Sequence, residues 1–396
     1  MSTATLNVED AVRARYSKAA EEREPALCCP VTYDPKLLEA IPAEVKERDY
    51  GCGNPAPYLR RGETVLDLGS GSGKIAFIAS QVVGPEGRVI GVDMNDDMLA
   101  LARRSIGEFA KNVGYANVEF KKGRIQDLAL DLGRIDARLV ERPVRSALDL
   151  GELETEMARL RRELPLIPSE SIDVVVSNCV LNLVRPEDKL GLFKEIHRVL
   201  KRGGRAVISD IVCDEDVPEH LMADAELWSG CISGALREDH FLEAFENAGL
   251  YGVTLLERDD KPWRTVEGIE LRSVVVAAYK GKEGPCLDQK HAVIYKGPFH
   301  TVKDDDGHIL RRGVRSAVCA KTFDIYMREP YRAHFEAVMP LTLVPLDEAP
   351  QFSSAACTGD AVLRHPRETK GLDYKVTTEA SAGACAPGAD GKASCC

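Results

Sequence analysis

The 396-residue sequence predicts an α/β fold built on a doubly wound, Rossmann-like sheet. Three observations support this prediction. Apolar, strand-like runs alternate with helical stretches, the first run leads directly into a glycine-rich turn, and the order closes with two consecutive strands. In such sheets the ligand lies beyond the carboxyl ends of the strands, so functional residues are expected in the loops that follow them.

The individual elements can be placed by their apolar patterns. The predicted strands begin with the run from Thr64 and continue at residues 88–93, 118–122, 172–177, 205–209, 253–257 and 274–279, and the clearest helices cover residues 98–113 and 189–200. A charged, Leu- and Arg-rich insertion at residues 131–163 interrupts the loop after the third strand. The helix-like spacing within it predicts a helical hairpin on the surface, with no chemistry of its own.

Composition narrows the classes of function. The chain is 44% hydrophobic and carries a formal net charge of −11, which argues against nucleic acid as a partner. The sequence has no apolar run long enough for a signal peptide or a membrane span, so a cytoplasmic protein is expected. Twelve cysteines in such a chain indicate ligands or redox groups rather than a disulfide framework.

The glycine-rich turn predicts a nucleotide-type cofactor. Gly69, Gly71 and Gly73 permit positive φ and close approach of a ligand, and the helix that follows presents free N–H groups. A lone glycine motif is weak, but Asp93 ends the next strand about 20 residues on, where a carboxylate accepts both ribose hydroxyls. Asp67 precedes the first glycine, and no second turn suited to pyrophosphate follows. These features favour S-adenosylmethionine over NAD.

Three cysteines stand in distinctive strings. Cys52 lies in Tyr-Gly-Cys-Gly, Cys179 in Ser-Asn-Cys-Val-Leu-Asn, and Cys231 in Trp-Ser-Gly-Cys. We expect Cys179 and Cys231 to follow strands at the carboxyl edge of the sheet, and Cys52 to come from an N-terminal lid. Any one of them alone is more readily explained as a small buried residue, but three beside a methyl donor suggest a soft metalloid as acceptor.

With these strings in view, the chain resembles the arsenite S-adenosylmethionine methyltransferases. The resemblance runs from Arg15-Tyr16-Ser17 through the three cysteine strings and the glycine loop to Tyr295-Lys296-Gly297-Pro298-Phe299. Many methyltransferases share the glycine loop, whereas the cysteine strings together are specific to this family. The resemblance implies a seven-stranded class I methyltransferase sheet, methylation of arsenite, and a role in arsenic detoxification.

It also implies roles for particular residues. Cys52, Cys179 and Cys231 would hold trivalent arsenic, and a fourth cysteine near the N-terminus would take part in a redox cycle. Here that position is a pair, Cys28-Cys29, so the assignment between the two stays open.

Further residues complete the predicted cofactor site. The resemblance places Tyr50 and Tyr16 near the sulfonium, although both could simply pack the lid. The remaining candidates are Met94 after the second strand, Ile125 and Asp127 after the third, with Asp127 accepting from the adenine amine, and Asn178, which could equally be a turn residue.

The chemistry of the residues agrees with this interpretation. Thiolates prefer soft acceptors, and arsenic held by three of them keeps a lone pair as nucleophile. No His, Asp or Glu adjoins Asn178 and Cys179 in the chain, so no general base is expected. Each transfer oxidises arsenic, and the thiols of Cys28 or Cys29 and of Cys52 or Cys179 would supply two electrons by pairing as a disulfide. Thioredoxin or glutathione would then regenerate the thiols.

Four segments are expected: an N-terminal lid and substrate segment (1–60), the S-adenosylmethionine-binding domain (61–280), a smaller C-terminal α+β domain (281–376) and a disordered tail (377–396). In the small domain, residues 314–322 predict a strand, and Asp304-Asp305-Asp306-Gly307 predicts a solvated hairpin turn, since the spacing of a calcium loop is missing. The tail contributes to a candidate arsenite-capture set of cysteines: Cys357, Cys385, Cys395 and Cys396.

Two rival functions remain open from the sequence. A class I methyltransferase acting on a small quinone- or lipid-like substrate would use the cysteines only for packing. A non-catalytic arsenic or zinc binder would have a vestigial glycine loop, although zinc would need a fourth ligand. Cys213, just past the fifth strand, is interpreted as a buried residue and not as a ligand. We expect a monomer that takes arsenite as a thiol conjugate.

Overall fold

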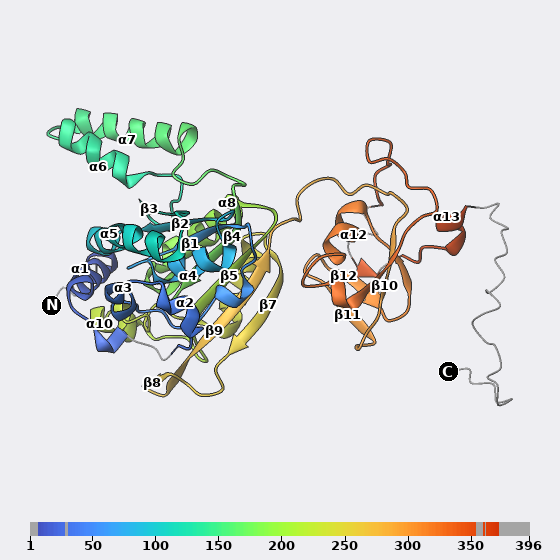
Figure 1. The fold of residues 1–396 in the computed structure, drawn as a ribbon. Coiled ribbons are helices and arrows are strands. Elements are labelled where there is room, and N and C mark those ends of the chain that lie inside the picture. The colour runs from blue at the N-terminus through green and yellow to red at the C-terminus, as the bar shows by residue number, and fades with distance from the viewer. Residues whose placement is uncertain (1–6, 28–30, 354–358, 361, 372–396) are drawn as a thin grey trace. The chain divides into compact units, whose positions relative to one another are not determined.

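A computed structural model of the chain describes residues 7–27, 31–353, 359–360 and 362–371. It divides into two compact units, Met1–Glu283 and Gly284–Cys396. The first unit contains the large sheet and the second two small sheets (Figure 1).

The first unit is built on a nine-stranded sheet whose main path has the order β3-β2-β1-β4-β5-β9-β7. The first five strands of this path run parallel, and β9 pairs antiparallel with both β5 and β7. The predicted doubly wound, seven-stranded class I methyltransferase sheet is therefore confirmed, with two short strands, β6 and β8, added to it. Its strands are β1 (Thr64–Leu68), β2 (Arg88–Asp93), β3 (Val118–Lys122), β4 (Ile172–Asn178), β5 (Leu200–Cys213), β6 (Leu236–Arg237), β7 (Tyr251–Arg258), β8 (Arg264–Val266) and β9 (Ile269–Tyr279).

Helices cover both faces of this sheet (Figure 1). Because side chains alternate along a strand, Leu66 and Leu68 of β1 join the core under α8 and α11, whereas Val65 joins the core under α4 and α5. The helices of the first unit are α1 (Val8–Glu21), η1 (Pro25–Leu27), α2 (Pro35–Glu39), α3 (Ala43–Glu47), η2 (Ala56–Tyr58), α4 (Lys74–Val83), α5 (Asp96–Val113), α6 (Leu132–Glu141), α7 (Ala147–Glu163), η3 (Leu181–Leu183), α8 (Pro186–Val199), α9 (Glu219–Met222), α10 (Ala225–Ser229) and α11 (Glu238–Asn247).

The insertion after β3 is the helical hairpin that the sequence predicts. Figure 1 shows α6 and α7 side by side, projecting from the sheet. Ile135 of α6 and Leu160 of α7 are buried in a small apolar cluster of their own with Leu130. Ser146 caps α7 by accepting from the backbone N–H of Asp149.

In the part of the chain that the structure describes, the second unit holds two three-stranded sheets, two short α-helices and one turn of 3-10 helix. The sheet orders are β13-β10-β14 and β11-β12-β15. The elements are β10 (Ala292–Tyr295), β11 (Thr301–Lys303), β12 (His308–Arg311), β13 (Arg315–Ala317), α12 (Ala320–Tyr326), η4 (Arg332–His334), β14 (Phe335–Val338), β15 (Gly359–Asp360) and α13 (Pro366–Lys370).

Two expectations for this unit need correction. The strand predicted over 314–322 covers only Arg315–Ala317, because the Cys319 side chain accepts from the backbone N–H of Thr322 and starts a helix at Ala320. The acidic turn does join the hairpin strands β11 and β12, but Asp304 is not solvated. Its carboxylate is only 12% exposed and accepts from His308 Nδ1 at 2.8 Å and from the Tyr326 hydroxyl at 2.6 Å.

Candidate active site

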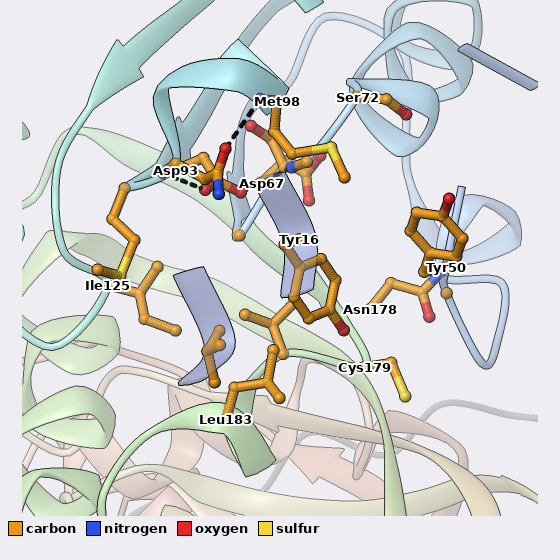
Figure 2. A pocket seen from close by; sticks show the side chains of 18 of the residues that line it. Tyr16, Tyr50, Asp67, Ser72, Asp93, Met98, Ile125, Asn178, Cys179 and Leu183 are labelled. Atoms are coloured by element: carbon orange, nitrogen blue, oxygen red, sulfur yellow. Dashed lines mark hydrogen bonds between the residues drawn. The ribbon is translucent and has the colours of Figure 1, made fainter. Parts of the chain in front are cut away.

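A cavity opens at the carboxyl ends of β1, β2 and β4, where the topology predicts ligand binding. About 1100 Å³ of space free of atoms lies within this cavity and its mouth, which is open to solvent. In Figure 2 Asp67 and Asp93 lie at one end of this cavity and Cys179 at the other, with the Tyr16 ring between them. Nine predicted cofactor residues line it directly: Tyr16, Tyr50, Asp67, Gly69, Gly71, Asp93, Met94, Ile125 and Asn178.

The glycine turn between β1 and α4 uses backbone conformations that side chains disfavour. Gly71 has φ +49°, and a Cβ built on it would meet no described atom within 4 Å. Because Gly71 also lines the cavity, its open side faces the space that a ligand would fill. Gly73, with φ +92°, is the N-cap of α4.

Asp93 ties this turn to the end of β2. Its Oδ2 accepts from the N–H of Gly71 at 2.8 Å, and its Oδ1 accepts from the N–H of Asn95 at 2.8 Å. Burial raises the pKa of Asp93, although these backbone hydrogen bonds oppose the shift. A carboxylate oxygen accepts more than one hydrogen bond, so ribose hydroxyls can still bind there.

Asp67 is the buried acid whose bonding is incomplete. Its side chain is 2% exposed, and Oδ2 finds no partner among the described residues. Burial, followed by the negative charges of Asp93 and Asp49, raises the pKa of Asp67 well above its usual range. An orphaned buried oxygen at a cavity wall fits a bound cationic donor, such as the ammonium group of S-adenosylmethionine. The residues present therefore fit this cofactor.

The N-terminal helix α1 covers the cavity. Arg15 donates from Nη1 to the Glu226 carbonyl at 2.8 Å, which fixes α1 against α10. Tyr50 donates its hydroxyl proton to the Ala19 carbonyl at 3.0 Å, and its ring packs edge-on against Tyr16 at 6.2 Å between centroids. Both tyrosines thus form part of the cavity wall and also hold α1 in place.

Cys52 is held in position by side chains from β4, β5 and β9. Asn178 Oδ1 accepts from the N–H groups of Cys52 at 2.8 Å and Gly53 at 3.0 Å, and its Nδ2 donates to the Gly53 carbonyl at 2.8 Å. Ser273 donates to the Cys52 carbonyl at 2.7 Å. A Cβ on Gly53 would lie 1.9 Å from Ser209 Oγ, so this approach requires glycine. Asn178 lines the cavity, and its amide is also the clamp for Cys52.

Cys179 and Cys231 share an unusual backbone conformation. Five non-glycine residues of the described chain have positive φ, and two of them are Cys179 (φ 64°) and Cys231 (φ 61°). For residues with a Cβ this region is strained, and such strain gathers at functional sites. Cys179 directly follows β4, as expected. Cys231 instead follows α10, because two short helices separate it from β5, so the expected strand-end position is wrong for Cys231.

The three predicted arsenic ligands lie together in one buried cluster. Each is 4% exposed. The Cys231 thiol donates to the Cys179 carbonyl at 3.1 Å and lies 3.9 Å from the Tyr16 hydroxyl. The Cys52 sulfur lies 3.9 Å from Ser209 Oγ. Cys213 shares the cluster and is fully buried, with its thiol donating to the Ala235 carbonyl.

The sequence reasoning missed an acid at this end of the cavity. A carboxylate oxygen of Asp210, on β5, lies with the sulfurs of Cys52 and Cys179 within 4.8 Å of one another. Burial raises the pKa of Asp210 to about 6. The expectation that no acid stands beside these cysteines is therefore wrong in space, although it holds along the chain. The sequence signal for it was that Asp210 interrupts the apolar run of the neighbouring strand.

Some predicted residues are not brought to the site. Asp127 is not part of the cavity wall, and it pairs with Arg161 of the helical hairpin at 2.8 Å. Cys28 and Cys29 lie outside the described residues, as does the whole capture set of cysteines.

Comparisons with known proteins agree with this geometry. A family model described as a methyltransferase domain matches residues 59–163 and 142–249. The fold, the glycine turn and the paired acids thus define a class I, S-adenosylmethionine-dependent methyltransferase. The arsenite methyltransferase of Aquipseudomonas alcaligenes is 30% identical over 352 residues, which cover 84% of this chain and 91% of that relative. The chain therefore belongs to the arsenite methyltransferase family.

Other relatives are matched over less of their length. The arsenite methyltransferases of Halobacterium salinarum and Mus musculus are 36% and 34% identical, over 58% and 62% of this chain and about half of each relative (48% and 55%). The crystal structure of CrArsM, an arsenic(III) S-adenosylmethionine methyltransferase from Chlamydomonas reinhardtii, superposes with a TM-score of 0.52 at 26% identity, covering 81% of this chain and all of that one. Residues 282–374 match a domain of unknown function (DUF8838). Within the described part of the chain, no helix has the length and apolar character that crossing a bilayer requires.

Proposed function

We propose that this protein methylates trivalent arsenic, using S-adenosylmethionine as donor and Cys52, Cys179 and Cys231 as the thiols that hold the substrate. The observation that carries the proposal is the strained backbone of Cys179 and Cys231, in the same buried cluster as Cys52 and beside the cofactor cavity. Strain of this kind persists only where the surrounding structure enforces it, which packing cysteines would not require.

The cavity end with the two acids would hold the cofactor. Asp93 would accept from ribose hydroxyls, and Asp67 Oδ2 would accept from the ammonium group. When bound, S-adenosylmethionine supplies an electrophilic methyl group on a sulfonium. The aromatic rings of Tyr16 and Tyr50 would lie near this positive charge, and α1 would keep water away from it.

The cysteine cluster would take arsenite by ligand exchange. Three cysteine thiols replace the three thiolate ligands of the thiol-conjugated arsenite and release three free thiols, so arsenic stays trivalent and keeps its lone pair. The Cys231 thiol would leave the Cys179 carbonyl to reach the same arsenic atom. Asp210 lies beside the thiols of Cys52 and Cys179 during this exchange. The residues then act by alignment, because a lone pair needs no base to become nucleophilic.

Each transfer raises arsenic to the pentavalent state, so a second round needs two electrons. We assign their source to two thiols, one of Cys28 or Cys29 and one of Cys52 or Cys179, which release two electrons and two protons as they form a disulfide. Thioredoxin or glutathione would regenerate the thiols. The products would be mono- and dimethylated arsenicals, made by a monomer in the cytoplasm for arsenic detoxification.

Purified protein incubated with arsenite, a thiol and S-adenosylmethionine tests this function, with the arsenic species separated afterwards. Methylated arsenicals are expected from the native chain and none from Cys179→Ser. Cys213→Ser is the control, since Cys213 lies in the same cluster but bonds to a carbonyl away from the cavity. A quinone or lipid methyltransferase would make no arsenical and would tolerate Cys179→Ser.

A further inference from the structure

The second unit contains a pair of thiols that the proposed catalysis does not use. Cys286 packs against the buried cluster of Ala317, Cys319 and Phe352. Cys319 is 1% exposed, whereas Cys286 is half-buried, so one thiol of the pair can be approached from outside. Both cysteines are free thiols.

Backbone hydrogen bonds hold the two cysteines next to each other. The N–H of Ala320 donates to the Leu287 carbonyl at 2.8 Å, which joins the residue after each cysteine. The N–H of Phe352 donates to the Cys286 carbonyl at 2.8 Å, and Lys321 Nζ donates to the Gly284 carbonyl at 3.4 Å. The separation of the two thiols is therefore set by the fold of this unit.

The Cys319 sulfur is also oriented. It accepts from the N–H of Thr322 at 3.4 Å and lies 3.2 Å from the Thr322 hydroxyl. Burial, opposed by these Thr322 hydrogen bonds and reinforced by the Cys286 thiol, raises the pKa of Cys319. Two adjacent thiols, one of them neutral and oriented, can chelate a soft acceptor that has two exchangeable positions.

We propose that Cys286 and Cys319 form a second arsenical-binding site, selective for monosubstituted trivalent arsenicals. The reaction is R–As(OH)₂ plus two thiols, giving R–As(S–Cys)₂ and two waters. Both thiol protons leave with the hydroxyls, and arsenic remains trivalent. Two thiols saturate the two exchangeable positions of such a compound, and the apolar side chains of Ala317 and Phe352 adjoin the substituent.

The inference rests on this thiol pair alone and not on the proposed function of the first unit. Loss of the pair would leave the cavity and the cluster of Cys52, Cys179 and Cys231 intact. The two proposals can therefore fail separately.

Phenylarsine oxide is the probe, because it carries one substituent and takes two thiols with release of one water. The full chain is reduced, freed of reductant, treated with the probe and digested with trypsin. Each cysteine of the pair lies alone in its tryptic peptide, residues 283–290 and 316–321. The expected product is these two peptides joined by a single phenylarsenic group. The link should resist a monothiol and be removed by 2,3-dimercaptopropanol.

Variants of the two cysteines test whether both thiols are needed for binding. Cys286→Ser and Cys319→Ser should each lower the number of bound phenylarsenic groups by one, because chelation needs both thiols. Cys213→Ser is the matched control and should lower it by none. Amide hydrogen exchange over residues 316–326 checks that each variant keeps its fold. Recovery of both peptides without phenylarsenic would overturn the proposal, as would their linkage to the Cys357 peptide instead of to each other.

Discussion

The side-chain amide of Asn178 holds the backbone of Cys52, accepting from its N–H at 2.8 Å across 126 positions of sequence. The same amide also accepts from and donates to Gly53. One residue at the end of β4 therefore positions one candidate arsenic thiol, while its neighbour in the chain, Cys179, supplies another.

Replacing Asn178 tests this clamp. Asn178→Ala removes the acceptor of the Cys52 and Gly53 N–H groups, at about 1–3 kcal/mol for each group that finds no other partner, whereas the Gly53 carbonyl keeps its hydrogen bond from the Tyr33 hydroxyl. We expect lower stability and a roughly tenfold weaker affinity for arsenite, since a 1.4 kcal/mol loss is tenfold in binding, so arsenite should raise the melting temperature by less than in the native chain. Thermal melts with and without arsenite measure both effects.

Asn117→Ala is the control for that experiment. Asn117 also bridges two backbone carbonyls, those of Gly84 and Gly87, but away from the cavity. It should lose stability and keep its arsenite response. An equal loss of arsenite response in both variants would contradict a specific role for Asn178.

Gly71 should govern cofactor affinity. In Gly71→Ala the new methyl group enters the open space of the cavity wall, and the positive φ adds about 1 kcal/mol of strain. Calorimetry should show weaker S-adenosylmethionine binding. Gly114→Ala carries the same kind of strain at φ +86°, also without close neighbours, at the end of α5. Unchanged affinity in Gly114→Ala together with reduced affinity in Gly71→Ala is the expected pair of results.

The strain at Cys231 can be measured directly. With φ 61°, Cys231→Gly should be more stable than Cys231→Ala by about 1 kcal/mol, because glycine adopts this conformation without cost. Cys213 lies within β5, where glycine is unfavourable, so the order of the same two substitutions should reverse there. Chemical denaturation of the four variants gives the comparison. Equal stability of both Cys231 variants would remove the strain argument.

The folding stability of the second unit should depend on pH through the carboxyl group of Asp304. Burial alone would raise the pKa of Asp304, but the hydrogen bond and charge of His308 and the Tyr326 hydroxyl outweigh it and hold the pKa below its ordinary value. A depressed carboxyl pKa stabilises the folded state above the unfolded value of about 4, and this stability is lost as pH falls through the folded pKa.

Asp304→Asn should therefore increase amide exchange over residues 301–326 at pH 7, and its difference from the native chain should shrink below about pH 4. Asp305→Asn is the control, because Asp305 is exposed and accepts a long hydrogen bond, at 3.3 Å, from the Tyr331 hydroxyl. A difference that grows on acidification would reverse the assigned sign.

Much of the fold follows from local pattern. The bounds of β2 and β3 match their apolar runs, and the hairpin of α6 and α7 follows from helical spacing. The glycine turn directly follows β1 and Asp93 ends β2, as the apolar runs predict. The prediction of a strand over 314–322 was wrong because Cys319 acts as a helix cap, which is a role that cysteine seldom takes.

The sequence by itself determined the sheet, the cofactor turn and the three cysteine strings, because these depend on periodicity and on residues close in the chain. Tertiary structure alone decided that Asp210 stands beside Cys52 and Cys179, that Asp127 pairs with Arg161, and that Cys286 meets Cys319. Each of these relationships joins segments far apart in sequence. Contacts of that kind arise from the packing of whole strands and helices, so the spacing of residues along the chain does not predict them.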